Sequence, residues 1–408
     1  MLTFKQYLIE AVKEGKNLHL EHLEDEVLNH GVDGTRAAIN FLQSLRDMLA
    51  GNAKRSVNVS VKWDGAPAIF AGINPENKKF FVGTKGVFNV NPKVNYTDAD
   101  IDKNHSAAGL NAKLKVALKH LPKLGITDVL QGDMLFTDDD FKTETIDDKS
   151  YITFTPNTIT YAIPKESSHK ITKAKMGIVW HTTYSGEKLE DMRASFGANI
   201  GGLTKTNDVW FSDANYQDTS GTVNFNKAET TKFTNILSLA GKQFRKLNSS
   251  FLNGLSKQAN ILILIKTFTN VKVREGQKIS NTARHTADMI KYIDDKLQKD
   301  IDKVKTQKTK DTKKKHKDRV VDFLTSNKSH LRNVFDMQNL LVDAKDAVIR
   351  KLEKAKGAMD TFIRTENGYR VTAPEGFVAI DQTGNAVKLV DRLEFSRANF
   401  NAAKDWAK

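Results

Sequence analysis

The sequence predicts an α+β protein in which a β-rich core is joined to helices before it and within it. Between residues 57 and 211, short alternating or β-branched runs are separated by Gly, Asn, Asp and Pro turns, a pattern typical of strands. From about residue 227 to 364 the apolar residues follow helical spacing instead. The predicted parts are a helical segment at 1–55, a first core part at 56–215, a basic helical insertion at 216–366 and a last core part at 367–408.

The N-terminal segment contains one clear amphipathic helix, which Gly51 ends. Its apolar face is formed by Ala38, Phe41, Leu42, Leu45, Met48 and Leu49. A stretch dense in ionisable groups precedes this helix at residues 19–26. The spacing of that stretch fits no standard zinc pattern. It is interpreted as a solvated helix face, as contacts near a bound nucleotide or as a metal site.

The core and the insertion differ in the period of their apolar residues. The strands expected in the core lie at residues 57–61, 80–82, 151–154, 158–163 and 177–180. In the insertion, one face of a long helix is traced by Leu331, Val334, Phe335, Leu341, Val348, Leu352 and Ala355, and a second helix is expected at 283–305.

Lys62 is the strongest candidate for a reactive side chain. It begins the tetrapeptide Lys-Trp-Asp-Gly, which follows one expected strand and precedes the apolar run at 66–70. A strand end fixes the backbone, Gly65 lets it approach a ligand closely, and the apolar run would partly desolvate the amine. These conditions suit a nucleophile, because a neutral amine attacks and an ammonium ion does not. The alternative interpretation is an ordinary surface lysine before an Asp-Gly turn.

Three motifs in this order resemble the covalent nucleotidyltransferase superfamily of ATP-dependent DNA ligases, RNA ligases and mRNA-capping enzymes. The tetrapeptide at Lys62 matches the superfamily's KxDG motif. Residues 375–378, Glu-Gly-Phe-Val, resemble its EGxV motif, and residues 387–392, which include Lys388, are similar to its lysine-bearing fifth motif. Three motifs in the right order occur by chance far less often than one.

Softer similarities lie between these motifs. Lys85 stands in the turn after the first motif, where the superfamily often has arginine. Asp133 lies in a stretch that resembles the third motif, in the place of the usual glutamate. Trp180 lies in a stretch that looks like the strand carrying a base-stacking aromatic residue, although the superfamily's acidic residue is absent there.

Other features favour an RNA ligase-like protein over a standard DNA ligase. Pro67 stands where DNA ligases and capping enzymes usually carry an arginine, and proline has no donor. Glu375, rather than aspartate, resembles ligases more than capping enzymes. Twenty residues follow Lys388, too few for the appended OB domain of those enzymes.

The resemblance implies an ATP-grasp-like two-sheet core and a covalent mechanism. Lys62 would attack the α-phosphate of ATP, expel pyrophosphate and become lysyl-AMP, while Lys388 would contact that phosphate. Glu375 and Asp133 would hold Mg²⁺ or Mn²⁺, since carboxylate and phosphate oxygens are hard ligands. The residues expected at the nucleotide are Asp64, Gly65, Lys85, Asp133, Trp180 and Glu375.

The net charge of +14 indicates a polyanionic partner, most simply nucleic acid. Eight lysines and one arginine against two aspartates lie between residues 303 and 319. This run is interpreted as a phosphate-binding patch or as a solvated helix face or loop. The residues expected to bind nucleic acid are Lys313, Lys314, Lys315, Lys317 and Arg319.

Composition excludes several chemistries. The chain has no cysteine, which excludes disulfides, thiolate zinc sites and cysteine nucleophiles. No stretch approaches a membrane span, and the N-terminus lacks the apolar core of a signal peptide. A cytoplasmic location is therefore expected.

Three functions remain open at this point. The first is a polynucleotide ligase that joins 5′-phosphate and 3′-hydroxyl ends of RNA or DNA through lysyl-AMP. The second is an adenylyltransferase that modifies a protein or a small molecule. The third is a noncatalytic nucleic-acid-binding protein with a degenerate core. The intact Lys62, Glu375 and Lys388 speak against the third, and the positive charge favours the first over the second.

Overall fold

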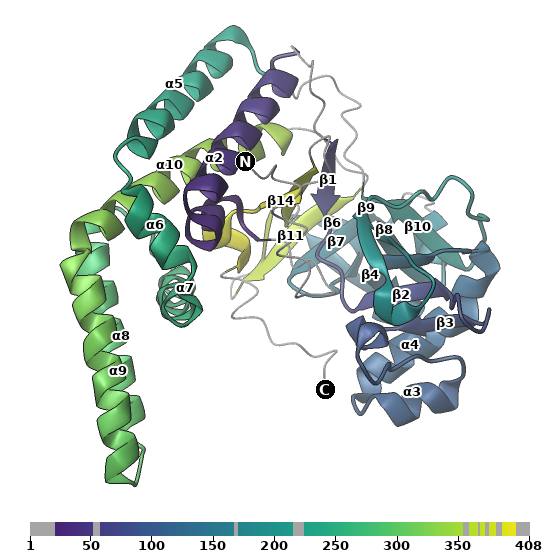
Figure 1. Cartoon of the computed structure of the whole chain (residues 1–408). Helices are drawn as coiled ribbons and strands as arrows, with labels where there is room; N and C mark the ends of the chain where they lie inside the picture. The colour runs from purple at the N-terminus through teal and green to yellow at the C-terminus, as the bar shows by residue number, and fades with distance from the viewer. Residues whose placement is uncertain are drawn as a thin grey trace.

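The computed structural model shows a mixed α/β protein with several sheets and a large helical body (Figure 1). It describes residues 21–51, 58–166, 170–214, 224–353, 359–365, 368–371, 375–380 and 386–396. Among these residues there are three sheets, of six, five and three strands, where two were expected. Residues 1–20 of the predicted N-terminal segment, with His19, lie outside the described part of the chain, as do Val57 and Ala355.

The six-stranded sheet has the order β10-β8-β4-β2-β3, with β9 paired to β8. Its strands are β2 (Ala68–Ile73), β3 (Phe80–Gly83), β4 (Val129–Thr137), β8 (Met176–Ser185), β9 (Arg193–Phe196) and β10 (Val209–Asp213). One face is covered by α4 (Ala108–His120), which follows α3 (Asp98–Asn104). Leu114 and Ala117 of α4 are buried there against Ile69, Leu130 and Ile178, so this face of the sheet is closed.

The five-stranded antiparallel sheet covers the opposite face of the six-stranded sheet. Its order is β12-β11-β7-β6-β5. Its strands are β5 (Lys142–Ile146), β6 (Lys149–Phe154), β7 (Ile159–Pro164), β11 (Asp360–Thr365) and β12 (Gly368–Val371). Phe154 and Tyr161 from this sheet pack with Phe136 and Val179 from the other. Because β11 already belongs here, the chain returns to the core before the predicted boundary at residue 366.

The three-stranded antiparallel sheet has the order β1-β13-β14. It joins β1 (Asn58–Lys62), β13 (Gly376–Ile380) and β14 (Ala386–Leu389). Alternate residues of these strands pack into the core of the helical body, as expected for a period of two. They are Val59, Val61, Phe377, Ala379, Val387 and Leu389. The helices therefore support this sheet from one face.

The helical body unites the N-terminal helix with the insertion. Its helices are α2 (Glu26–Leu49), α5 (Lys227–Phe244), α6 (Ser249–Ser256), α7 (Ala259–Arg274), α8 (Thr282–Asp302), α9 (Gln307–Ser326) and α10 (Lys328–Leu352). The apolar face predicted for α2 is buried against α5, α6 and α10, and the face predicted for α10 is buried as far as Leu352. Both helix predictions are confirmed, although α2 begins twelve residues earlier than the first expected apolar position, Ala38.

Helices α8 and α9 form a long hairpin that projects away from the sheets (Figure 1). The predicted helix at 283–305 corresponds to α8, which spans Thr282–Asp302. Within the described residues, no helix combines the length and apolarity needed to cross a membrane.

Candidate active site

The three-stranded sheet brings Lys62, Glu375 and Lys388 together from distant parts of the sequence. Lys62 ends β1 directly opposite Gly376, the first residue of β13, so Glu375 lies beside it. Lys388 of β14 lies opposite Val378 of β13. The carboxylate of Glu375 forms an ion pair with Nζ of Lys62. A nucleophile candidate, an acid and a second cation thus share one small sheet.

Gly376 makes this arrangement possible because its backbone is one that other residues rarely adopt. Its φ is +148°, and a Cβ atom there would lie 2.5 Å from the carbonyl oxygen of Leu389. Glycine alone tolerates both conditions easily. The Glu-Gly pair of the EGxV motif therefore has a steric reason in this chain.

The amine of Lys62 is held in its protonated form. Burial lowers its pKa, but the ion pair with Glu375 and the nearby carboxylates of Asp133 and Asp64 outweigh burial and raise it overall. The apolar flank was expected to favour the neutral amine, and this expectation is wrong as a net effect, because three carboxylates surround the group. The Lys62 side chain is 25% exposed and that of Glu375 10%, so a ligand can reach both.

Lys388 has the opposite electrostatic balance. Burial and the positive charge of Lys62 lower its pKa, and the carboxylate of Glu375 only partly offsets them. The pKa of Glu375 is raised by burial, against the effect of Lys62. The sheet therefore carries two lysines, one stabilised as a cation and one with a cost for its charge that an anionic ligand would relieve.

Asp64 holds the loop after Lys62 to strand β7. Its buried carboxylate accepts hydrogen bonds from the backbone N–H groups of Thr158 and Ile159, each at 2.6 Å, and from the side chain of Asn157 at 2.7 Å. Its own N–H donates to the hydroxyl of Tyr161 at 2.8 Å. Asp64 was expected to bind the nucleotide, but its oxygens are occupied in this way, so it positions Lys62 instead.

Gly65 allows this loop to pack closely on strand β4. A Cβ atom at position 65 would lie 2.6 Å from the Cβ of Asp133 and 3.0 Å from the carbonyl oxygen of Met134. Gly65 was expected to let the backbone approach a ligand closely, but in the structure its backbone approaches β4 instead. One result is that Asp133 lies next to the loop and contributes to the field at Lys62.

Trp180 is fully buried, on the face of β8 that packs with α4. A Cβ atom at Gly132 would lie only 2.7 Å from its ring, so no base could stack there. The expected base-stacking role is wrong for this residue. The neighbouring His181 points to the opposite face, where its Nε2 lies 3.7 Å from the carboxylate of Asp133.

His181 lies beside Asp133 in the candidate site, and the sequence did not point to it. Successive strand residues face opposite sides of a sheet, so a buried Trp180 implies that His181 faces the site. The alternation in β8 was visible, but which of its two faces is buried against a helix was not.

Lys85 is exposed at the same end of the six-stranded sheet as Asp133. It follows β3, whose last residue, Gly83, lies opposite Phe70 of β2. Strand β2 begins at Ala68, opposite Asp133. Lys85 therefore remains a candidate for contact with a substrate that lies across this edge.

The described part of the ionisable stretch, residues 21–26, lies as a largely buried strap over the small sheet, and we call residues 21–25 the strap. The backbone N–H of Lys388 donates to the carbonyl oxygen of Glu21 at 3.2 Å. Lys345 of α10 donates to both carboxylate oxygens of Glu24 at 2.9 Å. Arg392 makes a bidentate pair with Asp25 at 2.9 and 2.7 Å. A solvated helix face is therefore excluded for Glu24 and Asp25, which are both buried.

The buried carboxylates of the strap are paired with cations from other parts of the chain. Burial alone would raise the pKa of Glu24, but Lys345 and Arg392 outweigh it and hold the pKa at about 2. For Asp25, burial outweighs the effect of Arg392 and raises the pKa. These pairs tie α10 and the segment that follows β14 to the strap.

The donor set of the site fits a hard divalent cation shared with a phosphate. Asp133 and Glu375 both lie close enough to Lys62 to affect its pKa. Among the described residues, no group of three or more His, Asp or Glu side chains is arranged to hold a metal. Mg²⁺ commonly uses one or two carboxylates and completes its shell with water and substrate phosphates, which matches this pair.

The basic residues of α9 divide into two groups. Lys317 lies between the hairpin helices, donating to Gln298 at 3.0 Å and pairing with Asp294 at 3.1 Å. Lys313 reaches the carbonyl oxygen of Asp300 at 3.4 Å. Lys313, Lys314, Lys315 and Arg319 are exposed. Lys317, expected to bind nucleic acid, is thus used largely within the hairpin.

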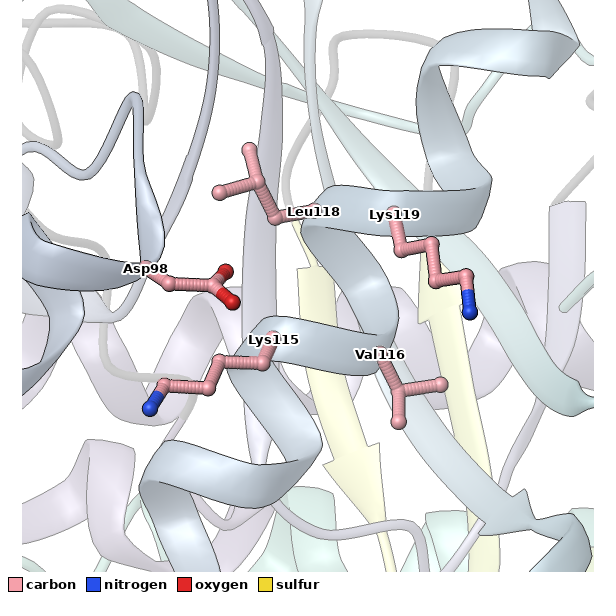
Figure 2. A pocket seen from close by; sticks show the side chains of 5 residues that line it. All are labelled: Asp98, Lys115, Val116, Leu118 and Lys119. Carbon is pink, nitrogen blue, oxygen red and sulfur yellow. The ribbon is translucent and has the colours of Figure 1, made fainter.

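One pocket, of about 380 Å³, lies beside α4 (Figure 2), and none of Lys62, Glu375 and Lys388 lines it. It is lined by Asp98, Lys115, Val116, Leu118 and Lys119. Their polar ends point in different directions, and Lys115 pairs with Asp102 at 2.8 Å. The pocket therefore offers no convergent set of groups for catalysis.

Comparison with known proteins identifies one family. The model of a family of unknown function (DUF6267) matches residues 17–404. No curated protein and no solved structure matches the chain. The span of the family match includes Lys62, Glu375 and Lys388, the helical insertion and the strap.

Proposed function

This chain belongs to the DUF6267 family, whose function is unknown, and we propose that it is an ATP-dependent polynucleotide ligase. The observation that supports this most strongly is the ion pair between Lys62 and Glu375 with Lys388 on the same sheet. The resemblance of the three motifs to nucleotidyltransferases concerns these same residues. We further propose that the sheets form an ATP-grasp-like nucleotidyltransferase core.

In the first step, Lys62 becomes covalently attached to AMP. Its ammonium group first loses a proton to water, which reaches the exposed part of the side chain. Nζ then bonds to the α-phosphorus of ATP while the bond from that phosphorus to the oxygen bridging the α- and β-phosphates breaks. Pyrophosphate leaves, and the nitrogen loses its second proton to water. Lys388 stabilises the negative charge that develops on the α-phosphate, because a cation in a partly buried site acts strongly there.

The other residues bind and orient the substrate. Asp64 and Gly65 hold the loop of Lys62 in place, and Lys85 lies at the edge where the ribose or an incoming 5′-phosphate would enter. Glu375 and Asp133 would hold Mg²⁺ or Mn²⁺, which when bound neutralises phosphate charge. In the later steps AMP passes from Lys62 to a 5′-phosphate end, and a 3′-hydroxyl displaces AMP as the new phosphodiester forms.

The experiment that tests the proposal is self-labelling with ATP. The purified protein is incubated with Mg²⁺ and with ATP labelled on either the α- or the γ-phosphate. Label from the α-position is expected to stay bound to the denatured protein, and label from the γ-position is not, because it leaves in pyrophosphate. Added pyrophosphate should remove the α-label by reversing the step. Absence of covalent label with ATP or GTP would favour the noncatalytic alternative.

The acceptor decides between the two enzymatic alternatives. Labelled protein is mixed with 5′-phosphorylated RNA, 5′-phosphorylated DNA and nicked duplexes, and the products are separated by size. The ligase proposal predicts AMP-capped and joined strands, whereas transfer of AMP only to a protein or a small molecule would support the adenylyltransferase alternative. The net charge of +14 is the feature that favours the polynucleotide.

Self-labelling is expected to speed up with rising pH. The pKa of Lys62 is raised, chiefly by Glu375 against the effect of burial, so the neutral amine is scarce at pH 7. The initial rate should therefore rise by up to roughly tenfold per pH unit between pH 7 and 9. In Glu375→Gln the negative partner is lost, the pKa of Lys62 falls, and the midpoint of the profile should move to lower pH. A profile that is flat from pH 6 in the wild type contradicts this account of Lys62.

A further inference from the structure

A hollow at the base of the hairpin has the features of a second binding site. It has a volume of about 570 Å³ and lies between α9 and the start of α7. Its lining residues are Lys257, Gln258, Ala259, Asn260, Ile261, His316, Arg319, Val320 and Phe323. None of the predicted catalytic residues is among them.

The charge of this hollow is entirely positive. Lys257 and Arg319 supply permanent cations, and no carboxylate is among the lining residues. Neither cation has a carboxylate partner within the described parts of the chain, although the Nε of Arg319 donates to the carbonyl oxygen of Lys315 at 3.2 Å. The terminal guanidinium nitrogens can still bind a phosphate in bidentate fashion.

The hollow also has an apolar wall and amide groups. Ile261 and Val320 line it but are only 5% and 4% exposed. The half-buried ring of Phe323, which is stacked on that of Phe251 with centroids 5.8 Å apart, therefore supplies most of the wall. The side-chain amides of Gln258 and Asn260 can donate and accept hydrogen bonds. Cations beside an aromatic and apolar wall form the combination by which proteins hold unpaired nucleotides.

We propose that this hollow binds a single-stranded part of the nucleic-acid substrate. Phosphates contact Lys257 and Arg319, and one base lies against the ring of Phe323. A paired base is stacked inside its duplex and cannot enter a recess, so a duplex would reach only the outer lysines of α9. The inference rests on the proposed polynucleotide substrate and names the form in which that substrate is held.

Binding is measured by fluorescence anisotropy with a labelled single strand and with a duplex of the same sequence. The double variant Lys257→Ala/Arg319→Ala is expected to bind the single strand roughly tenfold more weakly. The slope of log Kd against log[salt] should fall by about 1.4, since each phosphate contact on a single strand contributes about 0.7 to it. The matched control is Lys305→Ala/Lys308→Ala, which removes the same charge from exposed positions near the hairpin tip. Its loss should be about twofold or less.

The possible results separate this inference from the proposed function. Equal losses in the two double variants, or tighter binding of the duplex than of the single strand, would overturn the inference. All variants should self-label at the wild-type rate, since the hollow contains no catalytic residue. A wild-type protein that self-labels but binds no nucleic acid at low salt contradicts both the hollow and the ligase. Binding without self-labelling contradicts only the catalytic proposal.

Discussion

Lys62→Ala is expected to abolish the covalent label from α-labelled ATP, with a loss of at least about 10⁴-fold. The variant lacks the nitrogen that bonds to phosphorus. Lys62→Arg should be equally inactive, because a guanidinium group stays protonated and is a poor nucleophile. Removing Lys62 leaves Glu375 without its partner, but the pKa of this carboxyl is already raised by burial, so it can accept a proton and the fold should persist.

The controls for this prediction separate the two lysines of the sheet. Lys388→Ala should still form the adduct, about 10² to 10³-fold more slowly, as when one charge-stabilising group is removed from other enzymes. Lys79→Ala, at an exposed turn between β2 and β3, should label at the wild-type rate. Labelling of Lys62→Ala at the wild-type rate would contradict the assigned nucleophile.

Lys345→Met is expected to lower the free energy of unfolding by about 3–5 kcal/mol, the range for removing one partner of a buried ion pair. Lys345 is 1% exposed and its partner Glu24 is 3% exposed. The substitution keeps the volume but leaves the carboxylate of Glu24 with Arg392 at 3.5 Å as its remaining cation. The lower end of the range is therefore expected.

Urea unfolding followed by circular dichroism measures this effect. The matched control is Lys291→Met, which breaks an exposed pair with Asp295 on α8 and should leave the free energy of unfolding nearly unchanged. Adding Glu24→Gln to Lys345→Met should recover part of the loss, because the unpaired charge is then removed. A loss below about 1 kcal/mol for Lys345→Met would contradict a structural role for the buried pair.

The effect should also depend on pH. The pKa of Glu24 is held at about 2, below its usual 4.5, because Lys345 and Arg392 outweigh burial. A lowered carboxyl pKa stabilises the fold above the unfolded-state value and is lost as the pH falls through the folded-state value. In the wild type, the contribution of Glu24 to the free energy of unfolding should therefore be full at pH 7 and be lost between about pH 4.5 and 2, and this loss should be smaller in Lys345→Met.

The sequence was enough to predict that Lys62, Glu375 and Lys388 act together, because each belongs to a short motif and the motifs occur in a fixed order. Lys62 ends β1, and Glu375 directly precedes β13. The antiparallel pairing of these two strands brings both residues together. Gly376 and Gly65 are needed because a larger side chain would clash with a neighbouring strand. The sequence shows the two glycines but not the neighbours with which a side chain would clash.

What the sequence did not reveal depends on which face of an element is buried. Trp180 and His181 are neighbours in β8, and a strand pattern does not say which side meets a helix. Asp64 likewise gives no local sign that the backbone of Thr158 and Ile159 will occupy its oxygens. The strap was misjudged for the same reason, since Lys345 and Arg392 lie far from it in the chain.

The helices were easier to predict than their assembly. A long apolar face at helical spacing is a strong signal, and it located α2 and α10 correctly. The contact between them is a tertiary event without a local signature. Because α2 packs against α10, the N-terminal helix and the insertion form one helical body that supports the small sheet.

Peptide mass mapping of the adenylylated protein tests the central claim most directly. The pKa of Lys388 is lowered by burial and by Lys62, whereas that of Lys62 is raised, so Lys388 is the rival nucleophile on proton affinity alone. The protein is incubated with ATP and Mg²⁺, digested, and each lysine peptide is examined for the mass of one AMP. The account predicts AMP on Lys62 and none on Lys388. AMP on Lys388, or on any residue other than Lys62, would contradict it.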